Sequence, residues 1–152
     1  MSIESVRNYF IERTHQDPVF ELDDVSATVD QAASAIGVEP KLIAKTLAFR
    51  LKEKDILIVV RGDAKINNKK YKEAFNTKAK MLDLSEVEEI TGHPVGGVCP
   101  FGLKNPLDIY LDISLQNFEY VYPAAGAINA ALKITPSDMQ SITSAQWVDV
   151  CQ

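Results

Sequence analysis

The sequence contains few of the residues that metal sites and disulfide frameworks require. Only two cysteines, Cys99 and Cys151, and two histidines, His15 and His93, occur among 152 residues, and no CxxC pair is present. A disulfide framework and a dense zinc site are therefore excluded. We expect the protein to work without a metal and without a cofactor.

Long apolar runs and targeting signals are also missing. The longest apolar run, residues 56–60, is far shorter than the roughly 20 residues that a membrane span needs. The first four residues lack the basic and apolar regions of a signal peptide. There is no low-complexity tract, and 46% of the residues are hydrophobic, enough to form a core. We expect a single globular domain over residues 1–152, located in the cytoplasm and without membrane contact.

The common catalytic motifs are absent as well. GxSxG, HExxH, the P-loop and a GxGxxG after a strand do not occur. His15 and His93 could act as general bases, but isolated histidines in such positions are more often found at the surface. The neighbours of Cys99 supply no base, and no cysteine–histidine pair is expected from nearby motifs. Cys99 is therefore predicted to be structural, although a nucleophilic role is the alternative.

Positive charge is concentrated in one part of the chain. The net charge is −5, yet residues 41–80 hold twelve Lys and Arg against four acidic residues, a net of +8. Such a stretch can hold several phosphates of a nucleic acid. The alternative is that these cations form a solvated helix face.

Apolar spacing and cap residues predict an alternation of helices and strands. Helices are expected at residues 2–12, with Ser2 as cap, and at 29–36, 68–75, 85–90 and from 136 onward. Strands are expected at residues 19–22, 45–51, 56–61, 79–82, 107–113, 120–122, 130–134 and 147–151. Residues 92–106, rich in glycine and proline, are expected to form a shaped loop. The pattern favours an α+β fold, with a mixed sheet curled into a barrel and helices outside it.

One lysine stands within an otherwise apolar strand. Lys45 occurs where apolar residues would continue the strand, and a buried ammonium group needs an anionic partner. The partner is either an internal carboxylate or a bound phosphate.

Four motifs occur together in the order LIAKTLAFR, IVVRGDAKINNKK, TGHPVGGVCPFGL and YPAAGAINAALKITPSDM. In these motifs the chain resembles the YbaK/ProX-like aminoacyl-tRNA deacylases, the prolyl-tRNA synthetase-associated editing domain family, over residues 25–143. The resemblance implies a mixed six- or seven-stranded barrel with flanking helices. It also implies a free-standing hydrolase that cleaves the ester of a mischarged tRNA.

The resemblance further implies which residues form the site. Lys45 would hold the 3′ end of the tRNA, while Gly96 and Gly97 would bring backbone N–H groups to the ester and stabilise its oxyanion. A water oriented by the ribose hydroxyl of the substrate would attack, so no covalent nucleophile is needed. The acceptor stem would lie against four basic residues, Arg61, Lys65, Lys69 and Lys70.

The substrate amino acid is expected to be small. The pairs Ala130-Ala131 and Val98-Cys99 offer only small apolar groups, which suits alanine, cysteine, serine or threonine. The expected partners are aminoacylated tRNA and, in addition, an aminoacyl-tRNA synthetase. A non-catalytic module that binds tRNA ends or a synthetase is the alternative function.

Overall fold

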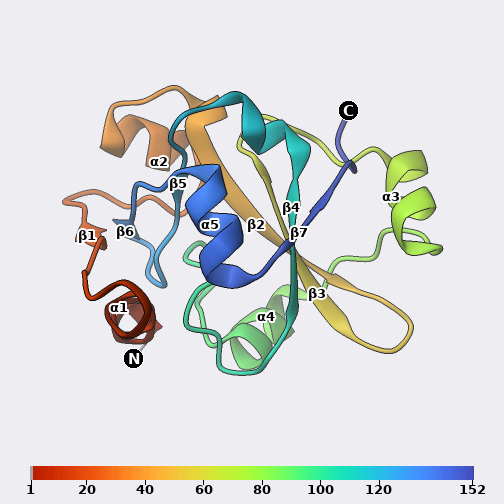
Figure 1. The fold of residues 1–152 in the computed structure, drawn as a ribbon, viewed down its shortest axis with the longest axis horizontal. Coiled ribbons are helices and arrows are strands. Elements are labelled where there is room, and N and C mark those ends of the chain that lie inside the picture. Colours follow the sequence, from red (N-terminus) through yellow and green to blue (C-terminus); the bar gives the residue numbers. More distant parts are fainter. Residues whose placement is uncertain (1) are drawn as a thin grey trace.

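The protein consists of a mixed sheet with helices on both faces (Figure 1). The structure is a computed structural model that describes residues 2–152. Its helices are α1 (Ser2–Thr14), α2 (Val29–Ile36), α3 (Asn68–Phe75), α4 (Leu84–Thr91), α5 (Pro136–Thr143) and the short 3₁₀ helices η1 (Pro40–Leu42) and η2 (Ile113–Asn117). Its strands are β1 (Phe20–Glu21), β2 (Ile43–Arg50), β3 (Asp55–Arg61), β4 (Asp108–Asp112), β5 (Tyr122–Pro123), β6 (Ala130–Ala131) and β7 (Gln146–Val148).

The five-stranded sheet has the order β5-β2-β3-β4-β7, and β1 pairs with β6 in a separate ribbon. The hairpin of β2 and β3 is antiparallel, whereas β5, β4 and β7 add in parallel. Isolated bridges, Val121 to Ile134 and Ala124 to Ala131, connect the region of β5 with that of β6. The predicted α+β class with a mixed sheet and flanking helices is confirmed, but the seven strands within residues 2–152 are divided between a five-stranded sheet and a two-stranded ribbon and do not form one sheet of six or seven strands.

Strand β3 divides the core between the two faces of the sheet. Val59 packs with the buried Val6 and Phe10 of α1 on one face. Ile58 packs on the other face with Tyr71 of α3. Because β3 is buried on both faces, it takes the central position that its continuous apolar run predicts.

The helix boundaries follow from local capping. Thr28 and Gln31 form a capping box at the start of α2, and Gly37 with φ +86° is its C-cap, which agrees with the predicted helix at residues 29–36. Asn67 caps α3 by accepting a hydrogen bond from the N–H of Lys70. Loop residues 92–106 contain no helix or strand, as predicted.

Three predictions about local structure are wrong. Residues 79–82 form no strand, because their pairing with β2 is limited to a single bridge between Met81 and Phe49. The last strand ends at Val148, because the Asp112 carboxylate takes the N–H of Val150 and interrupts the ladder. Ser2 is the first residue of α1 and not its cap.

No helix within residues 2–152 is long and apolar enough to span a membrane.

Candidate active site

The outer edge of β2 is only partly paired. Strand β5 pairs with Ile43 and Ala44, and further along the C=O of Ala48 and the N–H of Arg50 bond to the segment of residues 80–82. Backbone groups alternate between the two edges of a strand, so the N–H and C=O of Thr46 point to the same outer edge as those of Ala48 and Arg50. Thr46 therefore lies between the stretch paired with β5 and the stretch paired with residues 80–82.

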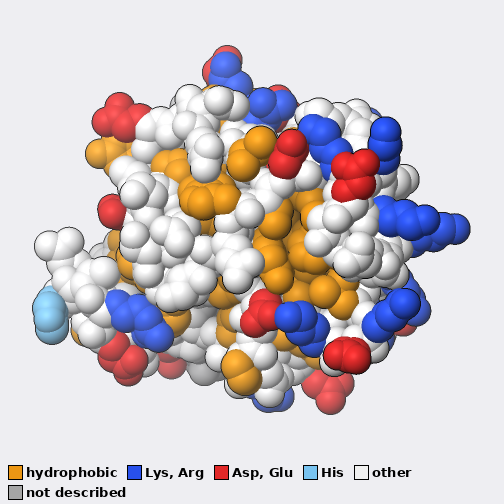
Figure 2. All heavy atoms as spheres, turned by 45° about the vertical axis from the view of Figure 1, so that its right-hand side comes forward, with side chains coloured by type: hydrophobic (Ala, Val, Ile, Leu, Met, Phe, Trp, Pro, Cys, Tyr) orange, Lys and Arg blue, Asp and Glu red, His pale blue; other side chains and the backbone are white. Residues whose placement is uncertain are grey.

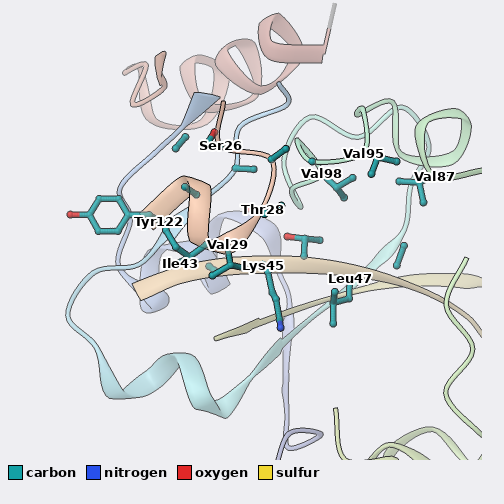
Figure 3. Close-up of a pocket in the computed structure, with 18 of the residues that line it drawn as sticks. Ser26, Thr28, Val29, Ile43, Lys45, Leu47, Val87, Val95, Val98 and Tyr122 are labelled. Atoms are coloured by element: carbon teal, nitrogen blue, oxygen red, sulfur yellow. The ribbon is translucent and has the colours of Figure 1, made fainter. Parts of the chain in front are cut away.

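A cavity of about 340 Å³ lies along this edge (Figure 3). It is mainly apolar, and its walls come from β2, α2, the start of α4 and the loop after α4. The lining residues are Ser26, Ala27, Thr28, Val29, Ala32, Ile36, Ile43, Ala44, Lys45, Thr46, Leu47, Ala48, Met81, Leu82, Leu84, Val87, Val95, Gly96, Val98, Tyr122, Ala124, Ala130 and Ala131. No carboxylate, imidazole or thiol is among these lining residues of the described chain. The cavity therefore offers shape, the hydroxyls of Ser26, Thr28 and Thr46 and other hydrogen-bonding groups, but its lining holds no carboxylate or imidazole that could activate a hydroxyl as a nucleophile.

Lys45 borders the cavity, but its ammonium group points away from it. Figure 3 shows the side chain leaving β2 on the side opposite Val95 and Val98. Its Nζ donates to the C=O of Ala64 over 2.7 Å. Burial lowers the pKa of Lys45, and the nearby charge of Asp63 partly opposes this effect. The ammonium group thus bonds a backbone carbonyl and not the internal carboxylate that was one of the two predicted partners.

The glycine pair occupies two different environments. Gly96 lines the cavity with φ +93°, and a Cβ there would lie 2.7 Å from the Cβ of Ala27. A Cβ on Gly97 would lie 2.7–2.9 Å from backbone atoms of Ala127. The N–H of Gly97 donates to the C=O of Pro94 over 2.8 Å. Of the two glycine N–H groups predicted to stabilise an oxyanion, that of Gly97 is thus already paired.

The four predicted stem-binding cations do not line the cavity. Arg61 pairs with Asp63, and Lys70 pairs with Asp149 over 3.0 Å. Lys65 and Lys69 are exposed and form no ion pair within residues 2–152. The surface in Figure 2 accordingly shows basic and acidic side chains mixed around a hydrophobic hollow. Exposed ion pairs contribute little, about 0–1 kcal/mol, so a phosphate could replace the carboxylates.

The expectations for His93 and its surroundings need correction. His93 is fully buried, and its Nε2 lies 3.5 Å from the Sγ of Cys99, so a cysteine–histidine pair does exist. Burial raises the pKa of Cys99 to about 12 and lowers that of His93. The pair is therefore a neutral thiol beside a neutral imidazole and contains no thiolate at neutral pH. Cys99 does not line the cavity, although Val98, Ala130 and Ala131 do.

One polar group of the cavity was missed in the sequence. The Oγ1 of Thr46 is buried and has no hydrogen-bond partner within residues 2–152. A buried hydroxyl without a partner is costly unless a ligand satisfies it. The available signal was a threonine directly after Lys45 in an apolar strand.

Comparisons with known proteins agree with this architecture. A sequence model described as the aminoacyl-tRNA editing domain matches residues 24–142. The chain is 48% identical to YwhH, an uncharacterised protein of Bacillus subtilis, over 100% of this chain and 98% of YwhH. It is 29% identical to EbsC of Enterococcus faecalis, named as a proposed Cys-tRNA(Pro)/Cys-tRNA(Cys) deacylase, over 84% of this chain and 78% of EbsC.

A solved structure gives the same result. A crystal structure described as that of a proposed trans-editing enzyme for prolyl-tRNA synthetase superposes with a TM-score of 0.90 at 31% identity. It covers 99% of this chain and 97% of the other. A mixed sheet whose open edge borders an apolar cavity, with a glycine loop at its wall, defines a small ligand-binding domain of the editing type. The chain belongs to the aminoacyl-tRNA editing domain family.

Whether deacylation needs a thiol or a metal can be tested without changing the residues that line the cavity. We expect Cys99→Ala to retain most deacylation activity, because Cys99 is buried outside the cavity as a neutral thiol. Chelators should also leave activity unchanged, since no group of three potential metal-ligating side chains occurs within residues 2–152. Initial rates of ester loss measure both effects, with Cys151→Ala as the matched cysteine variant. Loss of turnover on alkylation, reproduced only by Cys99→Ala, would contradict this prediction.

Proposed function

We propose that the protein acts as a free-standing deacylase that hydrolyses the ester of tRNA mischarged with a small amino acid. The observation that carries this proposal is the cavity itself, which is mainly apolar, lies at an open strand edge and has no carboxylate, imidazole or thiol among its lining residues. An aminoacyl ester is already activated, so its hydrolysis requires a positioned water and a stabilised oxyanion rather than an enzyme nucleophile.

Two groups of the protein would stabilise the reacting ester, and one group of the substrate would orient the water. The N–H of Gly96 and the hydroxyl of Thr46 are the donors that we assign to the developing oxyanion, because the N–H of Gly97 is already bonded. Gly97 would serve by allowing the close approach of the neighbouring segment at Ala127. The free ribose hydroxyl of the terminal adenosine would orient the water. No protein base is then required at the reacting carbon.

The terminal nucleotide would lie towards Lys45. The segment of residues 62–65 places Asp63 and Lys65 close enough to Lys45 to shift the pKa of its ammonium group. On tRNA binding, the ammonium group would exchange the carbonyl of Ala64 for a phosphate or ribose oxygen. Such a charge-assisted bond is stronger than a bond to a neutral carbonyl.

The cavity walls favour amino acids without a hydroxyl. Ala44, Ala48, Ala130 and Ala131 contribute only methyl groups. A serine or threonine hydroxyl seated against these four alanines, away from the hydroxyls of Ser26, Thr28 and Thr46, is left without a partner, which costs about 1–3 kcal/mol. Within the small class we therefore propose alanine and cysteine before serine and threonine. The name of EbsC, which includes Cys-tRNA, supports the same choice.

A panel of aminoacyl-tRNAs tests the proposal. Purified protein is incubated with tRNA(Pro) charged with alanine, cysteine, serine, threonine or proline. A second set carries each of these amino acids on its own cognate tRNA. The remaining ester is measured over time. We expect alanyl or cysteinyl esters to be lost fastest and prolyl-tRNA(Pro) to persist. Binding of every tRNA without turnover of any would instead identify a non-catalytic module for tRNA ends or a synthetase.

Phosphate contacts predict a strong salt dependence of tRNA affinity. If about three of Arg61, Lys65, Lys69, Lys70 and Lys72 neutralise phosphates, the slope of log affinity against log salt should be about −2 to −3. Lys65→Ala and Lys69→Ala should each make the slope shallower by up to about one unit, without changing which amino acid is removed. Lys70→Ala should have a smaller effect, because Lys70 is paired with Asp149.

The measurement is a titration of tRNA at several salt concentrations. Lys133→Ala provides the matched control, since Lys133 is exposed, lies over the Tyr120 ring and is remote in sequence from the basic stretch. An unchanged slope in the Lys65→Ala/Lys69→Ala double variant would mean that these cations are only solvated.

A further inference from the structure

The first turn of α1 contacts two separate loops near the glycine pair, residues 92–106 at two positions and the loop at Gly126 at one. The Oγ of Ser2 lies 2.5 Å from the Nδ1 of His93, and the hydroxyl of Ser5 donates to the C=O of Gly102 over 3.0 Å. A Cβ on Gly126 would lie 2.8 Å from the carbonyl oxygen of Ser2, so this glycine also touches the turn. One helical turn therefore fixes the spacing of loops that are distant in sequence.

The bonds of the His93 ring define its proton arrangement. Its Nε2 lies 2.7 Å from the carbonyl oxygen of Phe101, which can only accept, so Nε2 carries the hydrogen. Burial lowers the pKa of His93, which keeps the ring neutral, and Nδ1 is left as an acceptor for the hydroxyl of Ser2. The backbone N–H of His93 donates to the Oγ1 of Thr91 over 3.0 Å. His93 is thus held on three sides, and the Sγ of Cys99 lies 3.5 Å from its Nε2.

Two short paths lead from this turn to the glycine pair. Pro94 follows His93 directly and accepts the hydrogen bond of the Gly97 N–H. Gly126, which packs on Ser2, donates its N–H to the C=O of Gly97 over 2.9 Å. Both backbone polar groups of Gly97 are therefore bonded to segments that the first turn of α1 touches.

We propose that Ser2 and His93 act as positioning residues, which hold the glycine loop in the shape that deacylation requires. The inference rests on the proposed function. Ser2 belongs to α1, which lies before the residues 24–142 matched by the editing-domain family model, so the bond joins this helix to the matched residues. Neither residue lines the cavity, and each acts only through the loop.

Ser2→Ala tests the hydroxyl, with Ser2→Thr as the conservative variant and Glu4→Ala as the matched control. Glu4 lies in the same turn and is exposed. We expect Ser2→Ala to lower kcat about fivefold, the factor that corresponds to one hydrogen bond of about 1 kcal/mol, with KM changed less than about twofold. Ser2→Thr should restore most of kcat, and Glu4→Ala should match wild type. An unchanged kcat, or a loss that Ser2→Thr does not restore, would overturn the proposal.

Hydrogen exchange separates this proposal from the proposed function, because it needs no tRNA. We expect the N–H groups of Gly97 and Gly126 to exchange about fivefold faster in Ser2→Ala than in wild type, and equally fast in Glu4→Ala. If wild type deacylates nothing but these amides lose protection, the coupling stands and the proposed function fails. If wild type is active and the amides are unaffected by Ser2→Ala, the coupling is wrong.

The histidine provides a second test of the same bond. In His93→Gln the side-chain amide can still donate to Phe101, but it offers no acceptor at the Nδ1 position for Ser2. If the two residues act through one bond, the double variant Ser2→Ala/His93→Gln should have the same kcat as His93→Gln alone. Multiplicative losses in kcat would show independent roles and overturn the proposal. If His93→Gln fails to fold, the Ser2 variants still decide.

Discussion

Lys45→Ala is expected to lower kcat/KM for aminoacyl-tRNA deacylation about tenfold or more, while the protein remains folded. Charge-assisted hydrogen bonds contribute about 1.5–3 kcal/mol, and each 1.4 kcal/mol corresponds to about a factor of ten. The ammonium group bonds the C=O of Ala64 and forms no ion pair within residues 2–152. We propose that its charge serves a phosphate or ribose oxygen of the bound tRNA. Initial rates at subsaturating tRNA, together with thermal unfolding, measure both parts of the prediction.

Two further variants separate charge from packing at this position. Lys45→Met keeps an unbranched aliphatic side chain and removes the charge, so it should lose activity as Lys45→Ala does. Lys52→Ala removes an exposed lysine from the turn of the same hairpin and should match wild type. If Lys45→Met is as active as wild type, or if lost activity only tracks the unfolded fraction, Lys45 serves the fold and not the substrate.

The lowered pKa of Lys45 adds an expected pH dependence to the same prediction. Burial lowers its pKa below the usual value of 10.5, so the ammonium form is lost at a lower pH than in an ordinary lysine. If the charge holds tRNA, kcat/KM should fall as pH rises through this lowered pKa, after subtraction of uncatalysed hydrolysis. Lys45→Met should show no such fall, because it has no proton to lose.

Features determined by local sequence could be predicted, and they include much of the fold. The capping box at Thr28 and Gln31 and the glycine at position 37 define α2 within nine residues. The continuous apolar run of β3 requires burial on both faces, which predicts its central place in the sheet. In each of these cases the residues that decide the structure are neighbours in the chain.

Features that depend on distant partners could not be predicted. His93 was expected at the surface, but Ser2, 91 positions earlier, lies against its ring. The same applies to Thr46, because which edge of β2 stays open depends on how far β5 and residues 80–82 extend along it. The sequence indicated Lys45 and Gly96 as residues of one site, and both do border one cavity. It could not indicate that the ammonium group of Lys45 turns away from that cavity or that the N–H of Gly97 is already bonded.

Gly97→Ala is expected to reduce deacylation about 100-fold or more, the cost of misplacing reacting groups by about 1 Å. The added Cβ would lie 2.7–2.9 Å from the N, Cα and C atoms of Ala127, and backbone atoms cannot move aside as a flexible side chain can. The segment at Ala127 must therefore shift, which disturbs the bond from the Gly126 N–H to the Gly97 C=O. Because Gly96 is the adjacent residue, its N–H would leave the position that we assign to the oxyanion.

Gly37→Ala is the matched control for this effect. Gly37 also has a positive φ of +86°, but no atom lies within 4 Å of its added Cβ, so only backbone strain is introduced. It should lower the free energy of unfolding by about 1 kcal/mol and leave kcat per folded molecule unchanged. Gly97→Ala should lower kcat per folded molecule even where unfolding curves show that it is fully folded. If instead Gly97→Ala keeps kcat within about twofold of wild type, the close approach at Ala127 has no role in catalysis, and the oxyanion donors must lie elsewhere on the cavity wall.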